Sequence, residues 1–207
     1  MTDSELIKDF LGGNPVAYTQ LVERYETKVF RMVMGLIGDY HDSQEIAQDI
    51  FVKLYFKLAG FKGTAAFSTW LYTVVQNTVK NYRMKKQLKQ WVSLDWLFET
   101  IHFDVPSEAL PAENKVETQE TITLLNRALD QVPFHFRQIL ILREVNELSY
   151  EEIATVLNCS LGTVKSRLSR AKEKLSELFK TLEKGDAYVT HGNLAAGLPK
   201  PQNATAI

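Results

Sequence analysis

Apolar residues recur at every third or fourth position through most of this chain, and that spacing predicts α-helices with one buried face. In the first part of the chain the apolar repeats cover residues 17–33, 46–58 and 71–78. Two more repeats, over residues 122–132 and 136–141, follow further on. No segment alternates apolar and polar residues as a half-buried strand would. The sequence therefore predicts an all-α fold.

Turn and capping residues mark where the predicted helices begin and end. Gly12 and Gly13, followed by Asn14, end a first short helix, and Pro15 suits the first position of the next one. Side chains that accept a hydrogen bond from a free backbone N–H favour helix starts. The predicted starts of three helices are Asp3 or Ser4, Asp42 or Ser43, and Ser68 or Thr69.

The periodic segments fall into two blocks, which predict two small helical bundles over residues 1–92 and 117–183. Between them, residues 93–116 lack periodicity, contain two prolines and are rich in acidic side chains. This composition predicts a flexible acidic linker. Residues 184–207, rich in Gly, Ala, Asn and Pro, are predicted to form a disordered tail.

The segment SYEEIATVLNCSLGTVKSRLSRAKEK, residues 149–174, predicts a helix-turn-helix in the rear bundle. Ser149 and Glu152 have the spacing of a capping box, and the polar turn NCS separates the two helices. The second helix has an apolar face made of Val164, Leu168, Ala171 and Leu175, and an opposite face made of Lys165, Ser166, Ser169 and Arg170. Such a helix, held by a short preceding helix, suits the DNA major groove. The alternative is an ordinary helical hairpin with a solvated charged face.

A second segment, residues 61–86, interleaves aromatic and basic side chains at the end of the front bundle. The aromatic residues are Phe61, Phe67, Trp70, Tyr72 and Tyr82, and the basic ones are Lys62, Lys80, Arg83, Lys85 and Lys86. Aromatic rings stack on unpaired bases, and cations neutralise phosphates. Asn77 and Asn81 lie four residues apart and offer donors and acceptors to base edges. The segment favours binding of single-stranded or melted DNA, although core packing explains Trp70 equally well.

The composition excludes several other kinds of site. The formal net charge is only -1, so nucleic-acid binding would depend on local clusters of charge. The single cysteine, Cys159, allows neither an intrachain disulfide nor a Cys-rich zinc site, and the four histidines lack metal-ligand spacing. No stretch approaches the ~18 apolar residues of a membrane span, and the acidic N-terminus is unlike a signal peptide. We therefore expect a cytoplasmic protein with no metal, no cofactor and no membrane insertion.

Three motifs follow one another along the chain: SQEIAQDIFVKLYFKL (43–58), FSTWLYTVVQNTVKNYR (67–83) and LSYEEIATVLNCSLGTVKSRLSRAKEKL (148–175). In this order they resemble the sigma subunits of bacterial RNA polymerase, in particular the extracytoplasmic-function (ECF) group. The likeness covers residues 5–182, and the wording NTVKNY is similar to the envelope-stress (sigma-E-like) branch. The resemblance implies a factor that binds core RNA polymerase and directs it to promoter DNA.

The resemblance also implies roles for individual residues. The rear bundle would read the promoter −35 element through Arg143, Lys165, Ser166, Ser169 and Arg170. The front bundle would help melt the −10 element and hold a flipped base, through Phe61, Lys62, Gly63, Thr64, Phe67, Asn77, Lys80, Asn81 and Arg83. The polymerase would dock on Gln48, Asp49 and Lys53, for which the residues alone favour a solvated face. An anti-sigma protein, itself membrane-bound, is the expected regulator.

Two other functions compete with this interpretation. A stand-alone helix-turn-helix regulator would use the rear bundle alone, but the chain has no dedicated dimerisation helix and such regulators usually read palindromes as dimers. A nuclease or recombinase would need acidic residues that converge on a metal. The one acidic cluster near the front is spread around a helix and consists of Asp39, Asp42, Glu45 and Asp49. We therefore expect no catalytic residues.

Overall fold

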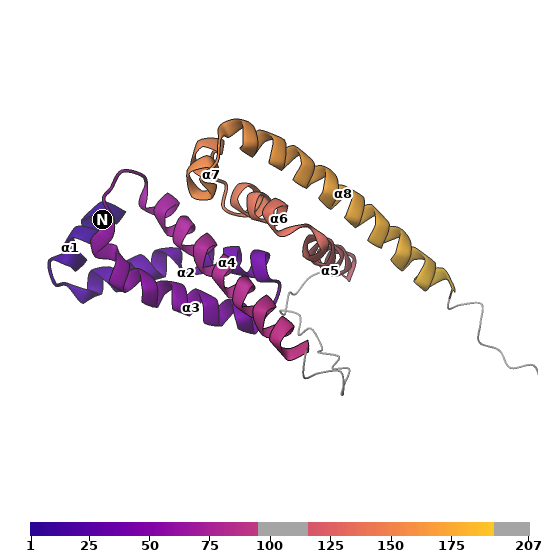
Figure 1. The fold of residues 1–207 in the computed structure, drawn as a ribbon, viewed down its shortest axis with the longest axis horizontal. Helices are drawn as coiled ribbons and strands as arrows, with labels where there is room; N and C mark the ends of the chain where they lie inside the picture. The colour runs from indigo at the N-terminus through magenta and orange to yellow at the C-terminus, as the bar shows by residue number, and fades with distance from the viewer. Residues whose placement is uncertain (95–115, 193–207) are drawn as a thin grey trace, which may run out of the picture.

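The computed structural model describes residues 1–94 and 116–192, and these residues form helices and turns without a strand, which confirms the all-α fold. The front bundle contains α1 (Asp3–Leu11), α2 (Pro15–Ile37), α3 (Tyr40–Lys57) and α4 (Phe67–Leu94), with a single 3-10 turn at Leu58–Gly60. The rear bundle contains α5 (Val116–Gln131), α6 (Phe134–Leu140), a π-helical turn (Ile141–Val145), α7 (Tyr150–Leu157) and α8 (Leu161–Gly192). Figure 1 shows the two groups of helices.

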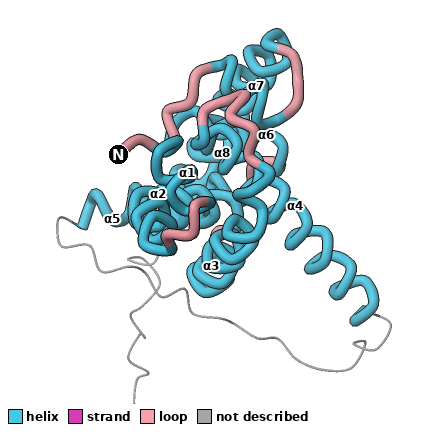
Figure 2. Tube along the Cα trace, turned by 90° about the vertical axis from the view of Figure 1, so that its left-hand side faces the viewer, coloured by secondary structure: helices cyan, strands magenta, loops and turns pink. Residues whose placement is uncertain are grey.

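The core of the front bundle forms where α2 packs against α1, α3 and α4. The four-residue repeat predicted on α2 is buried throughout, and its members are Ala17, Leu21, Tyr25, Val29 and Val33. Ile50 and Leu54 of α3 and Leu71 and Val75 of α4 are also buried. The last turns of α4 extend away from the other helices (Figure 2), so the basic end of this helix lies on the surface.

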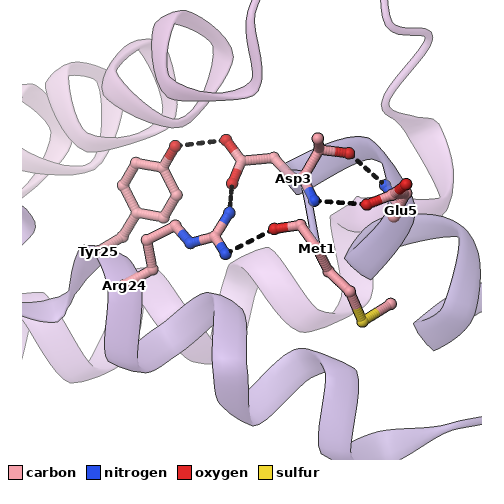
Figure 3. Close-up of polar contacts among 6 residues, drawn as sticks. Met1, Asp3, Glu5, Arg24 and Tyr25 are labelled. Carbon is pink, nitrogen blue, oxygen red and sulfur yellow. Dashed lines mark hydrogen bonds and ion pairs between the residues drawn. The ribbon is translucent and has the colours of Figure 1, made fainter.

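Helix α1 is fixed to α2 by polar contacts at its first turn (Figure 3). The Asp3 carboxylate accepts hydrogen bonds from the Arg24 guanidinium at 2.5 Å and from the Tyr25 hydroxyl at 2.5 Å. Thr2 caps the helix, in a capping box with Glu5. The predicted start at Asp3 or Ser4 is therefore wrong by one or two residues, because the Asp3 side chain is engaged with α2. Burial, and then the bond to Asp3, raises the pKa of Tyr25.

The other predicted helix starts are correct for α2 and shifted for α3 and α4. Pro15 is the first residue of α2, as predicted, and Asn14, which the sequence pattern assigned to the end of the first helix, caps it. Helix α3 is capped by Asp39, whose carboxylate accepts from the backbone N–H of Asp42 at 2.8 Å. The cap falls there because Gly38, with a left-handed φ of 82°, ends α2 and leaves a single residue before α3. Helix α4 begins at Phe67.

In the rear bundle, α8 packs against α5, α6 and α7 (Figure 1). The α7–α8 pair has the predicted helix-turn-helix form. The Ser149 hydroxyl and the Glu152 carboxylate form the expected capping box, with bonds of 3.1 and 2.8 Å. Asn158 ends α7 with a left-handed φ of 48°. The Ser160 hydroxyl accepts from the Thr163 N–H at 3.2 Å and so caps α8.

Two features of the rear bundle differ from the sequence prediction. The apolar stripe predicted over residues 122–132 is buried only at its end, because Ile122 and Leu125 of α5 remain 47% and 39% exposed while Val132, directly after α5, is buried. After α6 the helix does not simply continue. It widens into the π turn, closed by a bond of 3.1 Å from the Asn146 N–H to the Ile141 carbonyl.

The two bundles pack against each other, an arrangement that the sequence does not predict. Helix α4 packs on α7, and α2 packs on α6 and the π turn, so that one continuous cluster of buried apolar residues runs through both bundles. Helix α8 continues to Gly192, past the predicted end of the rear bundle at residue 183. The rest of the predicted tail, 193–207, and nearly all of the predicted linker lie outside the described residues.

Candidate nucleic-acid interface

The first turns of α8 expose one polar, basic face. Its four side chains, all exposed, are the predicted −35 readers Lys165, Ser166, Ser169 and Arg170. The opposite face is buried at Val164, Leu168 and Ala171, with Leu175 half-buried. The apolar spacing thus fixes which side of the helix faces solvent. Residues near the N-terminal end of a reading helix are the ones that contact base edges in helix-turn-helix proteins.

The two serines on this face are positioned by bonds within the helix. The Ser166 hydroxyl donates to the Thr163 carbonyl at 3.2 Å, and the Ser169 hydroxyl donates to the Glu173 carboxylate at 3.2 Å. Both hydroxyls are exposed, so they can exchange these partners for DNA. Lys165 and Arg170 contribute positive charge beside them.

Arg143, the fifth predicted −35 reader, is engaged inside the rear bundle. Its guanidinium donates to the Leu148 carbonyl at 2.7 Å and lies over the Tyr150 ring, 5.2 Å from the centroid. It therefore holds the loop that leads into α7. Helical periodicity carries no signal for this contact, because Arg143 lies in the π turn, which a regular helical pattern does not predict.

The loop before α4 and the first residue of that helix carry five of the predicted −10 residues, of which three are exposed and two are packed. Lys62, Gly63 and Thr64 are exposed. Phe67 is buried, with its ring 5.3 Å from that of Tyr25, and half-buried Phe61 lies against Phe67 at 5.7 Å. A base that reaches this loop would meet Lys62 to Thr64 first, with the Phe61–Phe67 pair as their support.

After this loop, the middle of helix α4 presents an exposed polar face. Asn77, Lys80 and Asn81 are exposed and fall on one side of the helix at spacings of three and four residues. Arg83 is separated from them, because its guanidinium lies over the Phe134 ring of the rear bundle, 4.3 Å from the centroid. Burial at this contact lowers the pKa of Arg83. The structure thus brings Asn77, Lys80 and Asn81 together on α4 and leaves Arg83 apart from them.

The predicted polymerase-binding residues lie on the exposed side of α3. Gln48, Asp49 and Lys53 are all exposed, and Lys53 pairs with Asp49 at 3.7 Å. Gln48 also lines a groove between α2 and α3, together with Val22, Phe30, Phe51 and Val52. Sequence analysis missed this groove. The available signal was Val52, an apolar residue off the buried stripe of α3, which is 59% exposed.

The acidic side chains near the front of α3 are used within the fold. Asp39 caps α3, and Asp42 accepts a hydrogen bond from Lys86 at 2.8 Å. No group of three or more His, Cys, Asp or Glu side chains that could hold a metal ion occurs within the described ranges, 1–94 and 116–192. In those same ranges no helix has the length and apolar character needed to cross a membrane.

Two domain families match this chain, one over the residues that contain the α4 surface and one over the residues that contain the α8 surface. Sigma-70 region 2 matches residues 21–89, and sigma-70 region 4 matches residues 122–175. The RNA polymerase sigma-H factor of Pseudomonas aeruginosa is 33% identical over 184 residues, which cover 87% of this chain and 95% of the relative. The ECF RNA polymerase sigma-E factor of Escherichia coli K12 is 33% identical over 185 residues, which cover 88% and 96%.

Solved structures share the fold. A sigma factor RpoE from Bartonella quintana, solved in complex with the anti-sigma factor NepR, aligns with a TM-score of 0.61 and 23% identity, over 79% of this chain and 96% of that one. CnrH, solved in complex with the cytosolic domain of CnrY, aligns with a TM-score of 0.64 and 22% identity, over 86% and 97%.

Fold, surfaces and relatives together define a promoter-specificity subunit of bacterial RNA polymerase. The chain belongs to the ECF sigma factors, as its motifs predict. Such a factor binds core RNA polymerase and directs promoter-specific initiation of transcription.

Proposed function

We propose that the rear bundle reads the −35 element through Lys165, Ser166, Ser169 and Arg170 on α8. The exposure of these four side chains on one face, opposite a buried apolar stripe, carries this assignment. Arg170 offers the planar fork that binds guanine in a bidentate manner, and the serines offer shorter contacts. Arg143 fixes the loop that leads into α7 through its bond to the Leu148 carbonyl, and so stabilises the helix-turn-helix that carries these side chains.

The front bundle opens the −10 element. Lys62, Gly63 and Thr64 form the exposed edge of a loop backed by Phe61 and Phe67. Asn77, Lys80 and Asn81 extend the surface along α4, followed by Arg83. Trapping one unstacked base costs about a few kcal/mol of stacking, which contacts of this kind offset.

Core polymerase docks on α3. Gln48, Asp49 and Lys53 supply the polar contacts, and the groove between α2 and α3 supplies apolar surface at Val52. An exposed apolar side chain inside a polar rim is the usual centre of a protein–protein contact. A docked polymerase would bring both DNA-binding bundles to one promoter.

The protein acts in the cytoplasm without catalytic residues of its own, since the polymerase supplies the chemistry. An anti-sigma protein regulates it. A sigma factor of the same fold, RpoE of Bartonella quintana, was solved in complex with the anti-sigma factor NepR, which supports this partner. We take the working units to be residues 1–92 and 117–183, with the acidic linker 93–116 between them.

The −35 assignment is tested by transcription from promoters that differ at single −35 positions. Arg170→Ala should lower initiation by about 1–3 kcal/mol per lost base contact and should relax selectivity at one or two positions only. Lys172→Ala is the matched control, because Lys172 is also an exposed cation on α8 but pairs with Glu144 at 2.9 Å. Equal losses on native and altered −35 elements would refute the assignment.

A further inference from the structure

Three basic side chains form a stripe along one edge of α2. Arg24, Lys28 and Arg31 are all exposed. At about 3.6 residues per turn, they fall within about 60° of one another around the helix. The exposed acidic side chains of the same stretch, Glu23 and Glu26, fall about 80° or more outside this α2 stripe. The chain has a net charge of only -1, so the stripe is a local feature and not part of a generally basic surface.

Two cations of the α2 stripe are not neutralised within the fold. The Arg24 guanidinium is occupied, because it donates to the Asp3 carboxylate at 2.5 Å and to the Met1 carbonyl at 2.9 Å (Figure 3). Lys28 and Arg31 belong to none of the ion pairs formed among the residues that the structure describes. Their charges therefore remain available to a partner.

Lys28 lies beside the aromatic support of the loop assigned to the −10 element. Its ammonium group is 5.9 Å from the centroid of the Tyr25 ring, within the range of a cation–π contact. The Tyr25 ring in turn lies 5.3 Å from that of Phe67, and Phe67 lies 5.7 Å from Phe61. A single ring therefore separates Lys28 from the Phe61–Phe67 pair behind the exposed residues 62–64.

The α2 stripe does not overlap the groove assigned to core polymerase. The α2 side chains that line the groove are Val22, Glu26 and Phe30. Around the helix, the groove residue nearest to the stripe is Phe30, about 100° from Arg31. A polymerase seated in the groove thus leaves the stripe open to another partner. That partner has to be negatively charged and has to reach the −10 loop as well.

The backbone of a melted DNA strand has both properties. Proteins that bind single-stranded DNA combine aromatic side chains for the bases with cations that follow the phosphates. Lys28 and Arg31 are three residues apart, or about 4.5 Å along the helix axis. That spacing is close to the ~3.4 Å between successive phosphates along one strand of B-form DNA. The stripe therefore suits two neighbouring phosphates of a strand that leaves the −10 loop.

We propose that Lys28 and Arg31 bind the backbone phosphates of the opened strand next to the base trapped at −10. The inference rests on the proposed role of the front bundle in opening the −10 element. Lys28, positioned by Tyr25, holds the phosphate nearer to the loop, and Arg31 holds the next one along α2. Phosphates are the same at every position, so these contacts stabilise the melted strand without adding sequence specificity.

Binding of a forked promoter fragment to the holoenzyme tests the proposal. The fragment is double-stranded upstream of −10 and single-stranded from −10 downstream, and it carries a fluorescent label for anisotropy. Each phosphate neutralised on a single strand contributes about 0.7 to the slope of log K against log salt. Lys28→Gln and Arg31→Gln should each reduce this slope by about 0.7, and the double variant should bind roughly three- to tenfold more weakly at about 0.1 M salt.

Two variants and a modified fragment serve as controls. Lys28→Arg should keep the wild-type slope, because it keeps the positive charge. Lys180→Gln should also keep it, since Lys180 is an exposed cation of α8 outside both DNA-binding surfaces. A fragment with uncharged methylphosphonate linkages next to the trapped base should bind wild-type holoenzyme more weakly. The same linkages should leave binding to the double variant unchanged, because the cations that meet these phosphates are already absent.

An unchanged salt slope in the double variant, or equal sensitivity of wild type and double variant to the uncharged linkages, would overturn the phosphate contact. A loss of affinity for core polymerase in the absence of DNA would assign the α2 stripe to the polymerase and would overturn it as well. If wild-type holoenzyme binds the forked fragment no better than a fully double-stranded one, the proposed opening of the −10 element fails instead. The two failures are thus distinguishable.

Discussion

The ammonium group of Lys86 donates a hydrogen bond to the Asp42 carboxylate over 2.8 Å and so ties the basic end of α4 to the first turn of α3. The bond to Lys86, with a second one from Tyr82, lowers the pKa of Asp42 below its usual 3.8. The same bond raises the pKa of Lys86 above its usual 10.5. Each partner therefore favours the charged state of the other.

This pair predicts a defined pH dependence of stability. The Asp42 contribution is fully present above pH 3.8 and is lost as the pH falls through the lowered pKa of the folded state. The Lys86 contribution is fully present below pH 10.5 and is lost as the pH rises through its raised pKa. Asp42→Asn should thus lower the free energy of unfolding by about 0.5–1 kcal/mol at pH 7, a small value because solvent screens the pair.

Thermal unfolding of wild type and Asp42→Asn at pH 7 and below pH 3.8 measures this effect. The difference in midpoint should narrow at the acidic pH. Glu45→Gln, an exposed carboxylate on the same helix, serves as the control for loss of one negative charge. A difference of constant size down to the acidic pH would show that the Asp42 charge is not responsible.

Arg143 should matter for stability as well as for DNA. Arg143→Ala removes a charged donor from the Leu148 carbonyl and a cation from the Tyr150 ring, so the free energy of unfolding should fall by about 1.5–3 kcal/mol. Urea unfolding measures the loss. Lys165→Ala, at an exposed position of α8, should change stability by less than about 0.5 kcal/mol. Equal stabilities of the two variants would mean that Arg143 serves DNA alone.

Helical periodicity was sufficient for the fold class, for both bundles and for the buried faces of α2 and α8, but not for the face of α5, where Ile122 and Leu125 stay exposed. The α2 repeat and the α8 stripe are buried as the sequence predicts, since a 3.6-residue period allows a single inward face. The exact helix starts were less certain. Thr2 is the cap of α1 because the nearby Asp3 side chain is engaged with Arg24, and Asp39 is the cap of α3 because Gly38 ends α2 and leaves a single residue before α3.

The candidate site was predictable where a residue's exposure follows from its place on one helix. Lys165 and Asn81 are exposed for that reason. Contacts between elements were not predictable. The burial of Phe67, the stacking of Arg83 on Phe134 and the bond from Arg143 all depend on how separate helices pack. A single sequence carries no direct signal for such packing.

Val52 should contribute to polymerase binding. It lines the groove between α2 and α3 and is 59% exposed. Val52→Asp should weaken affinity for core polymerase roughly tenfold or more, with little effect on folding, because it places a charge in the apolar centre of the contact. Val16→Asp is an exact control for exposure, since Val16 is also 59% exposed and lies on α2 outside the groove. Equal affinities of the two variants would remove the groove from the interface.

Asn81 should act in melting and not in −35 recognition. Asn81→Ala removes an exposed amide from the α4 face and should lower open-complex formation by about 1–3 kcal/mol if both amide atoms contact a base. Permanganate reactivity of unpaired thymines in the −10 element measures melting. Protection of the −35 element should be unchanged, and Gln87→Ala, further along the same helix, should leave both unaltered. Normal melting in the Asn81 variant would exclude this residue from the −10 surface.

We infer that this chain gives core RNA polymerase its promoter choice by reading two separated DNA elements. Run-off transcription from a randomised promoter library, with and without the chain, measures that choice. We expect the chain to enrich promoters with two conserved elements, and Arg170→Ala to relax the upstream element alone. Start sites and yields that are the same with and without the chain would refute this role.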